Sequence, residues 1–295
     1  MLHSVSPEHD THYEHSQSSS IEALVAARND GKKHLLLAAS GSVATIKSKW
    51  KQSHHAAQLP TDSWTAVPVI VEALAKYEGT LSIRIILTES ATHFLGGQSA
   101  EQPTVSSLLH LPNVEAVYRD HDEWGPQPWR RGASILHIES RRTGADMLVV
   151  APLSANTLAK VVNGMSDNLL TSVIRAWDTD ASIDMKKKII LVAPAMNSAM
   201  WRNPITEKQI RVLTDEWGVK EEEHAAGRVR SITGWFQVIM PVSKTLACGD
   251  TGALCCMAAG QKTVDVANLR CVGAMASVPD ICAVIEQRLN LTAGG

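Results

Sequence analysis

The sequence lacks the features that would assign it to several common classes of protein. Its 295 residues carry a formal net charge of only −2 and show no basic patch, which argues against nucleic acid as the main partner. No apolar run approaches the roughly 18 residues of a membrane-spanning helix, and the polar N-terminus lacks the apolar core of a signal peptide. The five cysteines show no CxxC spacing, so neither a zinc site nor a disulfide framework is indicated. We therefore expect a reduced, cytoplasmic chain without a membrane or nucleic-acid partner.

The N-terminal segment has a different composition from the rest of the chain. Residues 1–31 combine Ser, His, Glu and Asp with few apolar residues, which predicts a disordered polar tail. Its histidines have no preformed geometry for a metal ion, and we predict no metal site. Because 44% of the residues are hydrophobic, the chain can bury a core, and we expect residues 32–295 to form one domain.

Apolar runs alternate with helical patterns through this domain. Runs typical of strands lie at 34–39, 82–87, 114–118, 147–151 and 188–193, with a weaker one at 236–240. Helical patterns lie at 69–76, 156–162, 167–177, 206–216 and 279–289. This alternation predicts an α/β fold with a doubly wound, mostly parallel sheet and helices on both faces, as in flavodoxin-like and Rossmann-like proteins.

Small and hydroxyl-bearing residues follow the first two predicted strands. Gly41 comes directly after the first, where backbone N–H groups and the start of the next helix suit a phosphate, and Ser42 adds a hydroxyl. The segment lacks a full GxGxxG, which disfavours a dinucleotide and leaves a mononucleotide. Thr88 and Ser90 end the second strand and could supply hydroxyls to the same phosphate. A plain strand-to-helix turn is the alternative at Gly41.

Asn197 follows the predicted strand at 188–193. Ligands of open α/β sheets bind beyond the carboxyl ends of the strands, and an amide there can hold a carboxylate or a ring edge without adding charge. The alternative is a tight turn in which Met196, Met200 and Trp201 are core residues.

Three other positions also have two interpretations. Ser154 or Asn156 is a helix N-cap, with or without a ligand role. His137, in an apolar stretch, is either a buried core residue or a base that works near pH 7 and that Glu139 could orient. Cys248, in a glycine-containing turn, is either buried filler or a reactive thiol.

Five segments, taken in order, resemble the flavin-dependent cysteine decarboxylases, and within them the phosphopantothenoylcysteine decarboxylases. They read ASGSVA at 39–44, ILHIE at 135–139, APLSANT at 151–157, PAMN at 194–197 and LACGD at 246–250. Each segment alone is weak evidence, but five segments in the expected order carry the resemblance.

The resemblance implies an FMN cofactor and a homotrimer, or a heterotrimer with related subunits, with the site between subunits. It implies decarboxylation of 4′-phosphopantothenoylcysteine to 4′-phosphopantetheine in coenzyme A biosynthesis. His137 would assist thiol deprotonation, Asn197 would hold the departing carboxylate and Cys248 would supply a late proton. The residues implied to contact FMN are Gly41, Ser42, Val43, Thr88, Ser90, Ser154, Ala155, Asn156, Thr157 and Ala195, and those implied to contact substrate are Asn197, Met200 and Ala247.

Two other functions on the same fold stay open. Some fungal relatives bind and inhibit a Ser/Thr protein phosphatase as regulatory subunits, typically through chains with long acidic tails. Residues 289–295 contain no acidic run, and His137, Asn197 and Cys248 are all present, which favours the enzyme. A peptidyl-cysteine decarboxylase is the third interpretation, but it would not need the segment around Cys248.

Two stretches interrupt the expected pattern. Residues 48–66 break the first crossover helix, and residues 253–271 separate two pieces that are contiguous in the family. Both stretches are predicted to be in-frame insertions. Genuine surface loops are the alternative, because a sheet tolerates long loops at a modest entropic cost.

Overall fold

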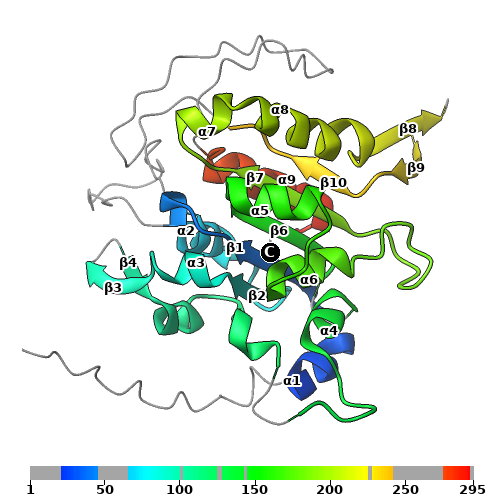
Figure 1. The fold of residues 1–295 in the computed structure, drawn as a ribbon. Coiled ribbons are helices and arrows are strands. Elements are labelled where there is room, and N and C mark those ends of the chain that lie inside the picture. The colour runs from blue at the N-terminus through cyan, green and yellow to red at the C-terminus, as the bar shows by residue number, and fades with distance from the viewer. Residues whose placement is uncertain are drawn as a thin grey trace, which may run out of the picture.

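The computed structural model describes residues 21–45, 66–99, 102–124, 128–142, 145–224, 228–241 and 275–292. A six-stranded, wholly parallel sheet forms their centre (Figure 1). Its four inner strands are buried along most of their length, because helices cover both faces and the sequence is apolar at successive positions, whereas its two edge strands are mostly half-buried. All six predicted strands are confirmed: β1 Lys33–Ala39, β2 Leu81–Leu87, β5 Val114–Arg119, β6 Met147–Leu153, β7 Ile189–Pro194 and β10 Phe236–Val238.

The strand order, β10-β7-β6-β1-β2-β5, contains one reversal. The chain moves outward from β1 through β2 to β5, and then crosses back to β6 on the other side of β1. The carboxyl ends of β1 and β6 therefore mark the topological switch point, the place at which such sheets bind ligands. Ser40 joins the two strand ends there, since its Oγ donates to Pro152 O at 3.0 Å and accepts from Ser154 N at 2.7 Å.

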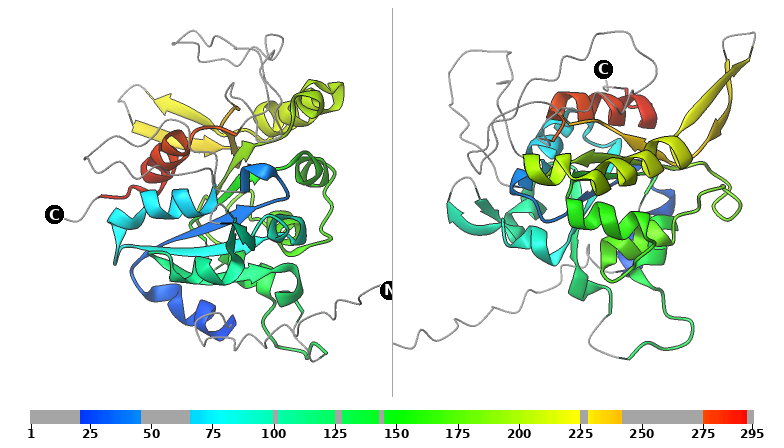
Figure 2. Two further views of the ribbon diagram at one scale, coloured as in Figure 1. Left: turned by 90° about the vertical axis from the view of Figure 1, so that its left-hand side faces the viewer. Right: turned by 45° about the horizontal axis from the view of Figure 1, so that its top comes forward.

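Alternate residues of the strands divide between two apolar cores. Leu35 and Leu37 of β1 belong to one core and Leu36 and Ala38 to the other, as the two-residue period of a strand requires. The helices of the two layers lie on opposite sides of the sheet in Figure 2. The first layer contains α2 Val67–Ala73 and α9 Val278–Leu289, and the second contains α1 Ile21–Ala26, α4 Leu136–Arg142, α5 Ala155–Val162, α6 Leu169–Arg175 and α8 Pro204–Arg211.

The structure also contains shorter elements. Two antiparallel hairpins, β3 Gly96–Ser99 with β4 Gln102–Thr104 and β8 Lys220–His224 with β9 Arg228–Thr233, lie outside the main sheet. The remaining pieces are α3 Glu89–Thr92, α7 Ser198–Arg202, the 3-10 helices Ala27–Asn29, Val43–Thr45, Ala75–Tyr77, Val105–His110 and Asp120–Asp122, and a π-helical turn at Val212–Glu216. Within the described ranges, no helix combines the length and the apolar character needed to cross a bilayer.

The predicted boundaries of the tail and the first insertion need correction. The tail is predicted to reach residue 31, but α1 begins at Ile21 and its Leu24 is fully buried. Apolar residues three apart give this short helix a buried side that the polar average of the segment conceals. Ala66, predicted to lie in the insertion, is also fully buried, and its N–H donates to Ala44 O at 3.1 Å. Residues 1–20, 46–65 and 253–271 lie outside the described part of the chain.

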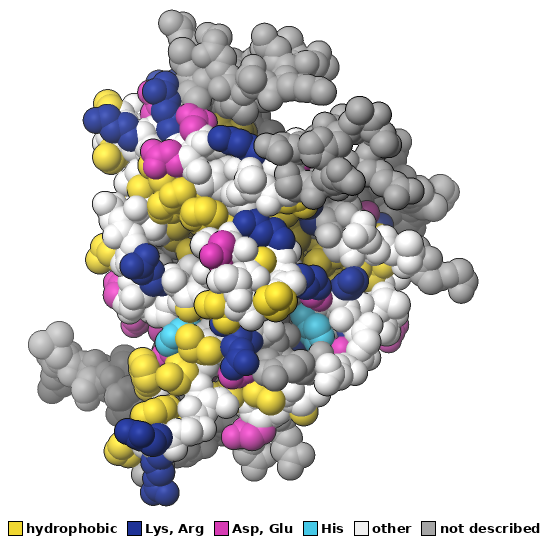
Figure 3. Space-filling view, turned by 90° about the vertical axis from the view of Figure 1, so that its right-hand side faces the viewer, with side chains coloured by type: hydrophobic (Ala, Val, Ile, Leu, Met, Phe, Trp, Pro, Cys, Tyr) yellow, Lys and Arg dark blue, Asp and Glu magenta, His cyan; other side chains and the backbone are white. Residues whose placement is uncertain are grey.

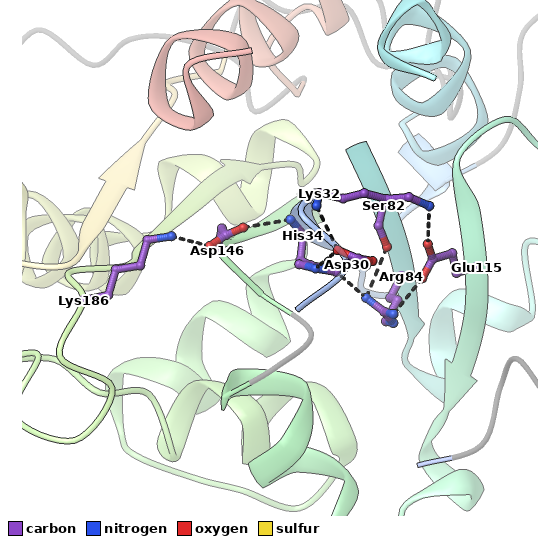
Figure 4. Close-up of polar contacts among 8 residues, drawn as sticks. All are labelled: Asp30, Lys32, His34, Ser82, Arg84, Glu115, Asp146 and Lys186. Carbon is purple, nitrogen blue, oxygen red and sulfur yellow. Dashed lines mark hydrogen bonds and ion pairs between the residues drawn. The ribbon is translucent and has the colours of Figure 1, made fainter. Parts of the chain in front are cut away.

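A polar cluster occupies the amino ends of β1 and β2 (Figure 4). Arg84, only 2% exposed, donates to Glu115 Oε2 at 2.6 Å and to His34 Nδ1 at 2.9 Å. Because a guanidinium can only donate, His34 Nδ1 must accept, which leaves Nε2–H to donate to Asp30 Oδ1 at 3.1 Å. The cluster lies at the edge of the sheet opposite the switch point, so it serves the packing of the strands and the N-terminal segment.

Candidate active site

Gly41 follows β1 and is predicted to bind phosphate. It packs against Ser90, which lies just after the end of β2. A Cβ atom built on Gly41 would come within 2.7 Å of Ser90 Cβ and 3.0 Å of Ser90 Oγ, so no side chain fits without displacing α3. The following turn is short: Ala44 N donates to Ser42 Oγ at 3.3 Å, and a 3-10 helix begins at Val43. Close approach of the backbone at a strand end is the property that a bound phosphate requires.

Thr88 and Ser90 bring two hydroxyl groups to the same place. Thr88 N donates to Ala39 O at 3.2 Å, which fixes the end of β2 beside the end of β1. Thr88 Oγ1 caps α3 by accepting from Ala91 N at 3.3 Å, and it lies 3.4 Å from Ser90 Oγ. The structure therefore gathers Gly41, Thr88 and Ser90 from two strand ends, as the sequence predicts.

The segment after β6 forms the other side of this switch point. Ser154, and not Asn156, is the N-cap of α5, because its Oγ accepts from Thr157 N at 3.2 Å. The hydroxyl groups of Ser154 and Thr157 are also 3.2 Å apart, so both are engaged within the cap. Asn156 is exposed at the start of the helix, and Ala155 is half-buried beside it. Asn156 is thus the polar side chain of this segment that remains available to a ligand.

Asn197 follows β7 and is the N-cap of α7. Ala195 N donates to Leu153 O at 2.9 Å, which holds the end of β7 beside the Ser154 cap. Asn197 Oδ1 accepts from Met200 N at 2.8 Å. Since the oxygen is used by the cap, the two Nδ2 hydrogens are left to donate to a ligand. The core interpretation holds for Met196 and Trp201, which are 7% and 5% exposed, but is wrong for Met200, which is 51% exposed.

His137 lies on α4 and contacts a residue that the sequence did not indicate. Its Nδ1 pairs with Glu123 Oε1, from the segment that follows β5 and the 3-10 helix Asp120–Asp122. The expectation that Glu139 orients His137 is wrong, because the contact of the imidazole is with Glu123 and Glu139 lies 3.5 Å from Arg142. A carboxylate 14 residues earlier in an irregular segment carries no sequence signal that would have identified it.

The predicted residues are thus brought together in part. The Gly41, Thr88, Ser154 and Ala195 segments share the carboxyl edge of the sheet, whereas no hydrogen bond or ion pair among the described residues joins His137 to them. Cys248 and Ala247 lie outside the described part of the chain. On the face seen in Figure 3, lysine and arginine side chains are interspersed with carboxylates and are not gathered in one patch.

The residues at these strand ends are of kinds that suit a mononucleotide flavin. Glycine is required at position 41 because Ser90 fills the space of a Cβ, which allows the turn after β1 to pack closely against α3. Hydroxyl groups flank this point, and the exposed Asn156 lies across the switch point. Ala195, a small residue that is 3% exposed, lies beside them at the end of β7.

Comparison with known proteins agrees with this geometry. The family model described as Flavoprotein matches residues 62–269. A phosphopantothenoylcysteine decarboxylase of Arabidopsis thaliana is 39% identical over 222 residues, which are 75% of this chain and 77% of the relative.

Two solved structures share the fold over nearly the whole chain. A PPC decarboxylase variant complexed with pantothenoylaminoethenethiol is 32% identical, with 88% of this chain and 100% of that chain covered and a TM-score of 0.55. The FMN binding protein AtHal3 is 33% identical, with 89% and 100% covered and a TM-score of 0.56.

Proposed function

This chain belongs to the Flavoprotein family, and we propose that it is an FMN-dependent carboxy-lyase that converts 4′-phosphopantothenoylcysteine to 4′-phosphopantetheine. The observation that carries the proposal is the convergence of four strand ends, those of β1, β2, β6 and β7, on one glycine- and hydroxyl-lined crevice. The similarity of three quarters of this chain to a phosphopantothenoylcysteine decarboxylase supports the reaction class.

The proposal assigns the predicted cofactor residues to the parts of FMN. Gly41, Ser42 and Val43, with Thr88 and Ser90, would hold the FMN phosphate, and the segments at 154–157 and Ala195 would border the ribityl chain and the ring. FMN held there would supply reversible two-electron oxidation of the substrate thiol, a chemistry that no side chain can supply.

Asn197 is suited to a carboxylate that must depart. Its amide donates a hydrogen bond to the substrate carboxylate while remaining neutral. A lysine or arginine there would stabilise the full negative charge of the ground state more than the transition state, in which that charge is leaving, and would slow the reaction. His137 acts as the base that accepts the proton of the substrate thiol.

The direct test compares decarboxylation by the FMN-loaded wild type and Asn197→Asp, with CO2 release and the product measured by mass spectrometry. Aspartate keeps the acceptor that caps α7 but replaces the amide donor with a repelling oxygen. We expect FMN to remain bound and the rate to fall on the order of 10²-fold.

Asn203→Asp is the matched control, because Asn203 also caps a helix, α8, by accepting from Ile205 N at 3.1 Å. This variant is expected to keep the wild-type rate. Full activity of Asn197→Asp would remove Asn197 from the site. Absence of CO2 release by the FMN-loaded wild type would contradict the proposed function itself, and binding to a Ser/Thr phosphatase would then be the hypothesis to pursue.

We also infer a trimer with the site between subunits, on the basis of the family resemblance, and a location in the cytoplasm, on the basis of the cysteine pattern. Sedimentation equilibrium of the purified protein tests the first statement, and fractionation of cells tests the second. A monomer that decarboxylates at full rate would contradict the shared site.

A further inference from the structure

Glu123 is a buried carboxylate whose contact is with the imidazole of His137. The side chain of Glu123 is 5% exposed and that of His137 is 21% exposed, so the pair lies at the protein surface with the histidine on the outer side. Glu123 follows the carboxyl end of β5, and His137 lies in the first turn of α4. The two residues therefore meet only because the segment after β5 folds against α4.

We propose that Glu123 is the positioning residue for His137, a role that rests on the decarboxylase function proposed above. The Glu123 carboxylate accepts a hydrogen bond from His137 Nδ1–H. An imidazole whose Nδ1 carries the proton presents an unprotonated Nε2, so the pairing selects the tautomer that can accept a proton at Nε2. The residue fixes both the direction of the ring and the nitrogen that acts.

The proton balance of the step follows from this pairing. The substrate S–H bond breaks and an Nε2–H bond forms, which leaves a thiolate and an imidazolium whose Nδ1–H is still held by Glu123. The imidazolium then lies beside a carboxylate that is largely shielded from water, where opposite charges attract more strongly than in bulk solvent. The carboxylate therefore favours the protonated product of this step.

Other charged groups near α4 are engaged elsewhere or make no contact with the ring. Arg141 pairs with Asp184 at 2.8 Å, and Glu139 lies 3.5 Å from Arg142. Within the described ranges, Glu123 alone forms a hydrogen bond or ion pair with His137. The remaining titratable or charged groups on the elements around α4 are Glu22 of α1, Arg175 of α6, and Asp120, His121 and Asp122 before Glu123.

Burial makes Glu123 an unfavourable choice for a purely structural contact. Its second oxygen, Oε2, is buried and has no hydrogen-bond partner among the described residues. A shielded carboxylate with one unused oxygen costs free energy that an apolar side chain of similar size would not. A role in the chemistry of His137 accounts for a carboxylate at this position.

The test uses Glu123→Gln and Glu123→Ala in the FMN-loaded protein, with Glu139→Gln as the matched control. ¹⁵N NMR of labelled histidine, with His137 assigned by loss of its signal in His137→Asn, reports the tautomer without reference to activity. We expect wild type and Glu139→Gln to show a protonated Nδ1 and a bare Nε2. Glu123→Ala is expected to lose this single tautomer.

Activity supplies the second readout. Glutamine can still accept from Nδ1–H but carries no charge, so Glu123→Gln should keep the tautomer, lose decarboxylation rate on the order of 10²-fold and move the acid limb of its pH–rate profile to lower pH. A merely structural role would leave that limb in place.

The outcomes separate the two proposals. An unchanged His137 tautomer in Glu123→Ala, or a wild-type pH–rate profile in Glu123→Gln, overturns the positioning role. If wild type releases no CO2, the decarboxylase proposal fails, and the NMR comparison still decides whether Glu123 sets the tautomer of His137.

Discussion

The contact between Gly41 and Ser90 permits a quantitative test of the phosphate crevice through Gly41→Ala. The new Cβ would lie 2.7 Å from Ser90 Cβ, whereas carbon atoms in contact are normally about 3.5–4.0 Å apart. Ser90 cannot move freely, since α3 is held by Asp120 Oδ2, which accepts from Glu89 N at 2.8 Å, and by the Thr88 cap. The strain must therefore be taken up at the strand ends that form the crevice.

Overpacking of this kind costs about 1–3 kcal/mol. If the cost falls on the FMN-bound conformation, it corresponds to an increase in the FMN Kd of about 5- to 150-fold. Quenching of flavin fluorescence on titration into apoprotein measures this Kd, and urea unfolding of the apoprotein measures how much of the cost falls on the fold itself.

Ser90→Gly provides the matched rescue, because removing the Ser90 side chain reopens the space that the added methyl group of Gly41→Ala needs. Alone, Ser90→Gly should cost about 0.5–1 kcal/mol of stability, as glycine does within a helix. Because Ser90 is itself assigned to the FMN phosphate, the rescue is read in the free energy of unfolding of the apoprotein. The double variant should be more stable than the sum of the two single changes predicts, with a coupling of about 1–2 kcal/mol. Wild-type FMN affinity and stability in Gly41→Ala, or simple additivity in the double variant, would refute the steric argument.

Three further predictions concern stability. Glu115→Ala should destabilise the protein by about 2–3 kcal/mol, because it leaves the buried Arg84 cation without its carboxylate partner. Arg84→Met should destabilise it less, because no buried charge is left, and comparison of the urea unfolding midpoints of the two variants tests this order. Burial tends to raise the pKa of Asp146, but the Lys186 ammonium and a backbone N–H hold that pKa below its ordinary value. The ionised Asp146 carboxylate should therefore stabilise the fold at neutral pH, and this contribution should be lost below about pH 4. Asp146→Asn should flatten that acid limb in pH-dependent thermal melts, and an unchanged limb would contradict the assignment. Ala66 N donates to Ala44 O at 3.1 Å, so the chain on the two sides of residues 46–65 is already held together. Deleting these residues should raise the free energy of unfolding in urea by up to about 2–3 kcal/mol through the loop-closure entropy removed, and a loss of folding would show that the segment is structural.

The sequence by itself determined the sheet and placed four of the candidate site residues at one of its edges. The apolar runs at 34–39, 82–87 and 147–151 predicted their strands to within two residues at each end, because strands covered on both faces must be apolar at successive positions. The residues that follow these runs share one edge of the sheet, since parallel strands all end on the same side. Gly41, Thr88, Ser154 and Asn197 could therefore be assigned to one crevice before any contact was known.

Only the tertiary structure decided which side chains meet within and around that crevice. Ser90 excludes a Cβ at Gly41 although the two residues are 49 positions apart, and Glu123 rather than Glu139 contacts His137. The cap at α7 uses Asn197 Oδ1 and so leaves its amide hydrogens to a ligand. These pairings depend on the order of the strands and on the path of irregular segments, which are set by packing between distant parts of the chain and leave no periodic signal in the sequence.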